Sequence, residues 1–188
     1  MKKILLFASG TGSNVENIIQ YFKNNPNISI VGVFTNNPNA KVLEKAKSHN
    51  VPTFIFDRNQ LSEDFVRNKI AELKPDLIVL AGFLWKFPEH IIADYPNKII
   101  NIHPALLPKY GGKGMYGMKV HQTVLDNNEK ETGITIHYVN EHYDEGEFIF
   151  QQKVNVEDCK TPEEIVAKVH ELEHKHFPEV IERLLRLA

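Results

Sequence analysis

The fold is decided near the N-terminus by the stretch KKILLFASGTGSN, residues 2–14. Its apolar run predicts a strand over Lys2–Phe7, which leads directly into a turn with two glycines. The residues that follow predict a helix from Ser13 to about Asn24. Ser13 is expected to be its N-cap, with Glu16 three residues later completing a capping box. A strand, a glycine turn and a helix in this order open an α/β fold.

The next part of the chain repeats this alternation of short apolar runs and amphipathic stretches. The expected strands are Ile28–Thr35, Thr53–Phe56, Asp76–Leu80 and Ile99–His103, and the expected helices are Lys41–His49, Ser62–Leu73 and Pro88–Asp94. Apolar strands that alternate with helices predict a parallel sheet covered on both faces.

The later part changes character at Gly111–Gly117, where four glycines in seven positions predict a loop. After it we expect a helix over Lys119–Asn127, strands over Thr135–Val139 and Phe148–Val156, and a helix that starts at Thr161-Pro162-Glu163-Glu164 and runs towards Leu187. The two late strands suggest a hairpin. The sequence therefore predicts one domain over residues 1–188. Its fold class is α/β, with a Rossmann-like, mostly parallel sheet, helices on both faces and an antiparallel C-terminal extension.

Composition restricts the function. The chain has 188 residues and a net charge of −2, with a pI of about 6.5, so neither nucleic acid nor another polyanion is an expected partner. No apolar run approaches the roughly 18 residues of a membrane span.

The apolar stretch Ile4–Ala8 is too short for a secretory leader. Cys159 is the single cysteine, which favours a reducing cytoplasm. We expect a cytoplasmic protein, monomeric or homodimeric, that acts on small molecules.

The turn Gly10-Thr11-Gly12-Ser13-Asn14 is a candidate phosphate site, because a helix N-terminus offers free N–H groups to an anion. A dinucleotide fits less well: Val15 replaces the third glycine of the fingerprint, and Thr35-Asn36-Asn37 lacks the carboxylate that binds a ribose hydroxyl. A plain tight turn is the alternative.

Three polar residues are candidates for catalysis. Asn101 and His103 are two residues apart at the carboxyl end of an expected strand, so their side chains share one face, and Pro104 ends the strand. Asp144, in a later loop with Gly146, is able to orient an imidazole or take a proton from an amine. Purely structural hydrogen bonding is the alternative for all three.

The segment His170-Glu171-Leu172-Glu173-His174 matches the H-E-x-x-H motif of zinc proteases. A third ligand would have to come from His176 or Glu182 on the same helix, so we expect no metal there. The segment is interpreted as a charged helix face that meets solvent or substrate. Leu84-Trp85-Lys86-Phe87 could line a cleft for an apolar ring or belong to the core.

Taken together, Ser9–Asn14, Asp76–Phe83, Asn101–Tyr110 and Asp144–Gly146 resemble the phosphoribosylglycinamide formyltransferase family of folate-dependent formyltransferases. The similarity covers essentially the whole chain. It implies transfer of a formyl group from 10-formyltetrahydrofolate, as co-substrate, to the amino group of glycinamide ribonucleotide in purine biosynthesis.

The resemblance also implies roles for individual residues. The catalytic set is Asn101, His103 and Asp144. The ribonucleotide set is Gly12, Ser13 and Asn14 at the phosphate, Glu173 at the ribose, and Pro104. The folate set is Leu84, Trp85, Lys86, Phe87, Asn140, Glu141, His142 and Tyr143, with Arg58 or Lys86 as the cation that meets an anion.

Two departures from the family pattern are visible. Trp85 stands where a basic residue is expected, and the loop after Pro108-Lys109-Tyr110 is longer and richer in glycine.

The expected mechanism is direct attack of the amine on the formyl carbon, through a tetrahedral intermediate. Asn101 and protonated His103 would stabilise the oxyanion, and Asp144 would favour the imidazolium. Three alternatives stay open: a hydrolase of the same folate, a formyltransferase for another amine, and a nucleotide-binding module without catalysis.

Overall fold

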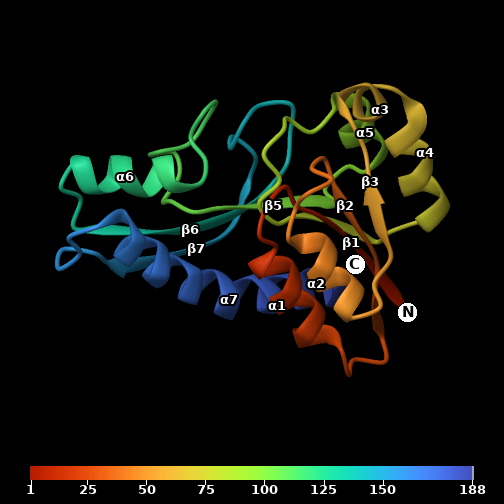
Figure 1. Cartoon of the computed structure of the whole chain (residues 1–188), viewed down its shortest axis with the longest axis horizontal. Coiled ribbons are helices and arrows are strands. Elements are labelled where there is room, and N and C mark those ends of the chain that lie inside the picture. The colour runs from red at the N-terminus through yellow and green to blue at the C-terminus, as the bar shows by residue number, and fades with distance from the viewer. Residues whose placement is uncertain (188) are drawn as a thin grey trace.

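A seven-stranded sheet organises the protein, as the computed structural model of residues 1–187 describes it (Figure 1). The strand order is β3-β2-β1-β4-β5-β6-β7. The strands are β1 (Lys2–Phe7), β2 (Ile28–Thr35), β3 (Thr53–Ile55), β4 (Leu77–Leu80), β5 (Ile99–His103), β6 (Glu131–Tyr138) and β7 (Phe148–Asn155). Strands β1 to β5 pair in parallel, whereas β6 is antiparallel to both β5 and β7. The predicted fold class is confirmed.

Helices cover both faces of this sheet. They are α1 (Ser13–Phe22), α2 (Val42–Ser48), α3 (Arg58–Ser62), α4 (Asp64–Leu73), α5 (Glu89–Asp94), α6 (Met118–Asp126) and α7 (Pro162–Leu187). Side chains of β1 alternate between two apolar clusters: Ile4 and Leu6 pack with α1, α2 and α7, and Leu5 and Phe7 pack with α4 and α5. No helix within residues 1–187 is long and apolar enough to cross a membrane.

Two local predictions about helix ends are wrong. Gly12, in the left-handed region at φ 70°, is the N-cap of α1, so Ser13 is the first helical residue and caps nothing with its side chain. Glu16 instead pairs with Lys45 of α2, with Nζ and Oε2 2.9 Å apart.

The helix expected over Ser62–Leu73 is α4, which begins two residues later at Asp64, and the short helix α3 before it was not expected. Asp57 and Gln60 form a capping box that starts α3 before Ser62, and extended Glu63 separates α3 from α4. The start expected for α7 at Thr161-Pro162-Glu163-Glu164 is confirmed, and a capping box forms there. The Glu164 amide donates to Thr161 Oγ1 at 3.3 Å, and the Thr161 amide donates to Glu164 Oε2 at 3.2 Å.

The turn between β1 and α1 depends on Gly12. Its positive φ is strained for any residue with a Cβ, and a Cβ there would overlap Val42 at the start of α2. Gly10 has open space around it and no positive φ. The two glycines of the motif therefore have different structural roles.

We predict that Gly12→Ala lowers the free energy of unfolding by about 2 kcal/mol or more, because overlap with Val42 adds to the left-handed strain. Gly10→Ala is the matched control and should change it by less than about 0.5 kcal/mol. Urea unfolding followed by circular dichroism measures both. Equal effects of the two substitutions would contradict this explanation of the turn.

Candidate active site

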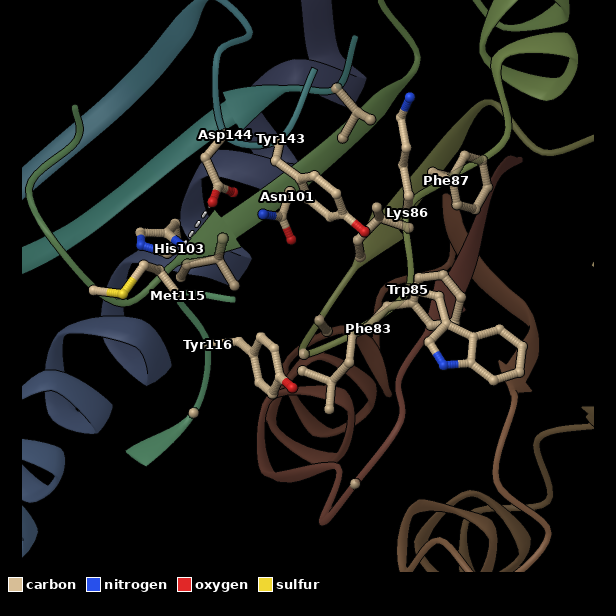
Figure 2. A pocket seen from close by; sticks show the side chains of 18 of the residues that line it. Phe83, Trp85, Lys86, Phe87, Asn101, His103, Met115, Tyr116, Tyr143 and Asp144 are labelled. Atoms are coloured by element: carbon tan, nitrogen blue, oxygen red, sulfur yellow. Dashed lines mark ion pairs between the residues drawn. The ribbon is translucent and has the colours of Figure 1, made fainter. Parts of the chain in front are cut away.

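One large cavity of about 1140 Å³ collects the predicted motifs at the carboxyl ends of β1, β4 and β5. Of the predicted site residues, Gly12, Ser13, Asn14, Arg58, Leu84, Trp85, Lys86, Phe87, Asn101, His103, Pro104, Asn140, His142, Tyr143, Asp144 and Glu173 line it. Glu141 does not. Its carboxylate is exposed and lies 3.8 Å from Nε2 of the adjacent His142. Figure 2 shows His103, Asn101 and Asp144 close together, with Trp85 and Phe87 at the other end.

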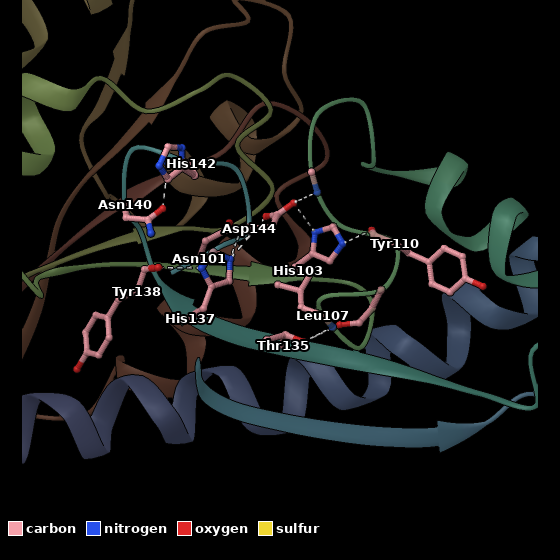
Figure 3. Close-up of polar contacts among 12 residues, drawn as sticks. Asn101, His103, Leu107, Tyr110, Thr135, His137, Tyr138, Asn140, His142 and Asp144 are labelled. Atoms are coloured by element: carbon pink, nitrogen blue, oxygen red, sulfur yellow. Dashed lines mark hydrogen bonds and ion pairs between the residues drawn. The ribbon is translucent and has the colours of Figure 1, made fainter. Parts of the chain in front are cut away.

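The polar cluster centres on Asp144. Its carboxylate lies 3.5 Å from Nδ1 of His103 and 3.6 Å from Nε2 of His137, while the Gly112 amide donates to it at 3.0 Å. Asn101 Nδ2 is 3.2 Å from Nε2 of His137 (Figure 3). Both histidines are almost completely buried. The structure thus brings the three predicted catalytic candidates together and adds a second histidine.

Asp144 reaches this cluster because the connection between β6 and β7 folds tightly back over the strands. Gly146 permits this, since a Cβ there would overlap the Tyr138 carbonyl. Asp144 itself adopts a positive φ of 56°, which aspartate tolerates better than most residues. The carboxylate is therefore held in place by the backbone as well as by its hydrogen bonds.

The electrostatics keep the carboxylate charged and the imidazole neutral. Burial by itself would raise the pKa of Asp144, but the adjacent imidazoles of His137 and His103 and the Gly112 amide hold that pKa below its ordinary value. Burial lowers the pKa of His103, although Asp144 and the Tyr110 carbonyl oppose this shift. His103 in the free protein is therefore a neutral imidazole at pH 7, next to an ionised carboxylate.

The glycine turn occupies another wall of the cavity, where Glu173 of α7 faces it. Asn14 Nδ2 donates to Glu173 Oε2 at 3.0 Å, and His170 Nε2 lies 3.7 Å from the same oxygen. Glu173 is 5% exposed, and its burial raises the pKa of the carboxyl group to about 7. This wall combines the open amides of a helix N-terminus with a carboxyl group that readily gains a proton.

The side chains of the segment His170–His174, which matches H-E-x-x-H, differ in their contacts and in their exposure to solvent. The rings of His170 and His174 stack 6.0 Å apart, whereas Glu171 is exposed to solvent. No group of three or more His, Cys, Asp or Glu side chains within residues 1–187 is arranged to hold a metal ion. The buried acid of the segment is Glu173, which lies outside the motif's conserved letters and lines the cavity.

At the apolar end of the cavity, the Arg58 guanidinium lies over the Trp85 ring, 4.4 Å from its centroid. Trp85 in turn packs edge-on against Phe56 at 6.3 Å. Lys86 pairs with Glu89, with Nζ and Oε1 3.1 Å apart. Arg58 forms no ion pair with the described residues, so it is the more available cation of the two.

Comparison with known proteins decides the family. A family model described as "Formyl transferase" matches residues 2–181. The chain belongs to the formyl transferase family. The resemblance drawn from the sequence motifs is thereby confirmed.

Bacterial relatives are similar to this chain over most of their length. The chain is 36% identical to phosphoribosylglycinamide formyltransferase of Bacillus subtilis, covering all of this chain and 96% of that one. Its structure resembles that of phosphoribosylglycinamide formyltransferase from Bacillus halodurans, with a TM-score of 0.88, 34% identity and coverage of 98% and 95%.

Plant relatives are longer. The chain is 37% identical to the chloroplastic phosphoribosylglycinamide formyltransferase of Arabidopsis thaliana over 96% of its own length, and it spans 64% of that protein. It spans 61% of the corresponding protein of Vigna unguiculata.

His137, which lies beside Asp144 and Asn101, was not among the site residues expected from the sequence. The antiparallel register pairs His137 of β6 directly with Asn101 of β5, which brings the two side chains together. A histidine within the apolar strand sequence Ile134–Val139 was the available signal. That Asn101 is its neighbour could not be predicted without knowing the register between β5 and β6.

We predict that Glu173 makes stability depend on pH. Below about pH 4.5 the carboxyl is protonated in both states. Between about pH 4.5 and 7 the folded protein binds the proton more tightly than the unfolded chain, so the free energy of unfolding falls as pH rises, by about 3 kcal/mol in total. Above pH 7 this loss is complete.

Glu173→Gln removes this contribution. Denaturant titrations of both proteins from pH 4.5 to 8 measure it as the difference between the two curves. Parallel curves would show that Glu173 does not hold its proton in the folded state.

Proposed function

We propose that the protein transfers the formyl group of 10-formyltetrahydrofolate to the amino group of glycinamide ribonucleotide. The observation that carries this proposal is the position of the Asn101–His103–Asp144 cluster in one cavity, between a phosphate-type turn and an aromatic end. A phosphorylated amine and a ring-bearing formyl donor would then meet at that cluster. The bacterial relatives, which carry the name of this activity over nearly their whole length, support it.

The ribonucleotide is proposed to bind with its phosphate at the amides of Gly12, Ser13 and Asn14, where the N-terminus of α1 favours an anion. Glu173, held by Asn14 Nδ2, would accept hydrogen bonds from the ribose hydroxyls. Pro104 would border the amine end, since it follows His103 and lines the same cavity.

The folate is proposed to lie along Leu84, Trp85, Lys86 and Phe87, opposite the loop that carries Asn140, His142 and Tyr143. Arg58 on the Trp85 ring would meet an anionic part of this molecule, in place of the basic residue expected at position 85. Glu141 has no part in this pocket, because its carboxylate is exposed outside the cavity.

In the proposed mechanism, the amine nitrogen attacks the formyl carbon and the carbonyl electrons move onto oxygen. Asn101 Nδ2 stabilises this oxyanion, a donor worth roughly 3–4 kcal/mol in such sites, and His103 adds to this only once it has become an imidazolium. Because His103 is neutral at rest, it accepts the proton that the amine loses, and ionised Asp144 stabilises the resulting imidazolium. Collapse of the intermediate returns that proton to the leaving folate nitrogen.

We further propose that residues 1–188 act as one domain, as a monomer or a homodimer, in the cytoplasm. One family model matches residues 2–181, and one continuous sheet organises them, which supports a single domain. The single cysteine, buried Cys159, has no partner for an internal disulfide, which suits a reducing compartment.

We predict that 10-formyltetrahydrofolate loses its formyl group only when glycinamide ribonucleotide is present, with recovery of the formylated ribonucleotide. A spectrophotometric assay of the folate, with and without the amine, measures this. Equal loss in both tubes would identify a hydrolase. No loss in either tube would exclude this substrate pair and direct the assay to other phosphorylated amines.

We predict that Asp144→Asn lowers turnover by about a hundredfold or more, because the imidazolium loses its charged partner. The folded state should persist, as circular dichroism and thermal unfolding would show. Glu145→Gln, which neutralises the exposed neighbouring carboxylate outside the cavity, is the matched control and should leave turnover unchanged. Near-normal turnover of Asp144→Asn would remove Asp144 from the mechanism.

A further inference from the structure

Both ring nitrogens of His103 face hydrogen-bond acceptors. Nε2 lies 2.7 Å from the Tyr110 carbonyl oxygen, whereas Nδ1 lies 3.5 Å from Oδ2 of Asp144 (Figure 3). A neutral imidazole carries one N–H, and the shorter, stronger contact is the one at Nε2. The neutral ring therefore keeps its proton on Nε2, with the free lone pair on Nδ1 directed to the carboxylate side.

The Tyr110 carbonyl is in this position because Tyr110 adopts the left-handed conformation, with φ 57°. That conformation is rare for a tyrosine and persists only where surrounding contacts impose it. The backbone at Tyr110 is thus a place where the fold enforces a geometry that the local sequence does not favour.

One anchor of this residue is the tyrosine hydroxyl. It donates to Glu129 Oε1 at 2.7 Å and accepts from Asn127 Nδ2 at 3.1 Å, both just beyond the end of α6. Lys109 also reaches Glu129 Oε1, at 3.0 Å, but its side chain is exposed. The side chain of Tyr110 is therefore anchored at one end while its carbonyl holds the histidine at the other.

The same segment holds the carboxylate. Two residues after Tyr110, the Gly112 amide donates to Oδ2 of Asp144 at 3.0 Å. Between them, Gly111 packs so closely that a Cβ would overlap Leu107 and lie 3.4 Å from Cβ of Asp144. Residues 110–112 thus fix the imidazole and the carboxylate relative to each other.

We propose that Tyr110 is a positioning residue: anchored through its hydroxyl to Glu129, it keeps a proton on His103 Nε2, so that Nδ1 is the nitrogen that accepts and returns the amine proton. This inference rests on the proposed function for its catalytic part. The step is balanced, since the proton leaves the attacking amine for Nδ1 and goes from Nδ1 to the leaving nitrogen of the folate.

A bond from Nε2–H to the carbonyl also favours the charged ring, because the N–H of an imidazolium is a better donor. This bond opposes the effect of burial on the pKa of His103. The other ionisable groups around His103 are Asp144 from the β6–β7 connection, His137 of β6 and His121 of α6. None of them contacts Nε2 in the described structure, so loss of the Tyr110 contact should lower the pKa of His103.

The first experiment measures the histidine itself. Protein labelled with ¹⁵N-histidine is titrated by NMR, and the His103 signals are identified by their loss in His103→Asn. We expect the Nε2–H tautomer of His103 in the wild type. In Tyr110→Phe and Glu129→Ala we expect a mixture of tautomers and a lower pKa of His103. This readout needs no substrate, so it decides the positioning role even if the proposed activity is absent.

The second experiment separates kcat from KM in formyl transfer. Tyr110→Phe and Glu129→Ala should lower kcat about tenfold or more, because small misplacements of a reacting group are costly, while both KM values change less than about twofold. Glu129→Gln keeps an acceptor oxygen for the hydroxyl and should restore kcat. Lys109→Gln removes only the exposed ion pair with Glu129 and should behave as wild type.

Three results would overturn the proposal. The first is an Nδ1–H tautomer of His103 in the wild type. The second is unchanged tautomer, His103 pKa and kcat in both Tyr110→Phe and Glu129→Ala. The third is a loss of thermal stability in these variants without a change in the NMR signals, which would make Tyr110 a structural anchor alone.

Discussion

The antiparallel pairing of β6 with β5 is the constraint on which the site depends. It places His137 opposite Asn101 and Thr135 opposite His103, so two polar pairs lie side by side within an apolar sheet. The chain then turns back over these strands and delivers Asp144 to both histidines. This return loop is short because β7 pairs antiparallel with β6, whereas a parallel β7 would need a long crossover.

Burial then gives these groups their chemical character. His103 is hidden from solvent, and this burial lowers the pKa of its imidazole, so a charged ring is costly at rest. Asp144 stays ionised because an N–H of the backbone and the neighbouring imidazoles compensate its own burial. The result is a base whose proton affinity rises as negative charge develops beside it. This behaviour suits a reaction in which an amine loses a proton while an oxyanion forms.

The two ends of the cavity are built on different physical principles. At the glycine turn, backbone amides and the buried Glu173 offer directional hydrogen bonds, which suit a phosphorylated sugar. At the other end, Phe83, Trp85 and Phe87 offer flat apolar surface (Figure 2), with Arg58 stacked on the indole. The cluster at the end of β5 lies where the two kinds of surface meet.

The sequence by itself determined the α/β class, the strands β1, β2 and β5 to the residue, and sixteen of the residues that line the cavity. Short-range rules suffice there, because apolar periodicity and glycine turns report local backbone preference. These rules failed at Ser13, because Gly12, which packs against Val42 of α2, is the N-cap of α1. They also failed at Glu141, because the direction of its side chain depends on how the β6–β7 loop folds back.

Only the tertiary structure decided which polar groups meet. Strand register brought His137 to Asn101, and packing around α6 put Tyr110 into a conformation that its own sequence disfavours. The neutral state of His103 and the raised pKa of Glu173 likewise follow from burial, which a local motif does not contain. Residue type was readable along the chain, whereas distance, burial and charge state arise from contacts between segments far apart in it.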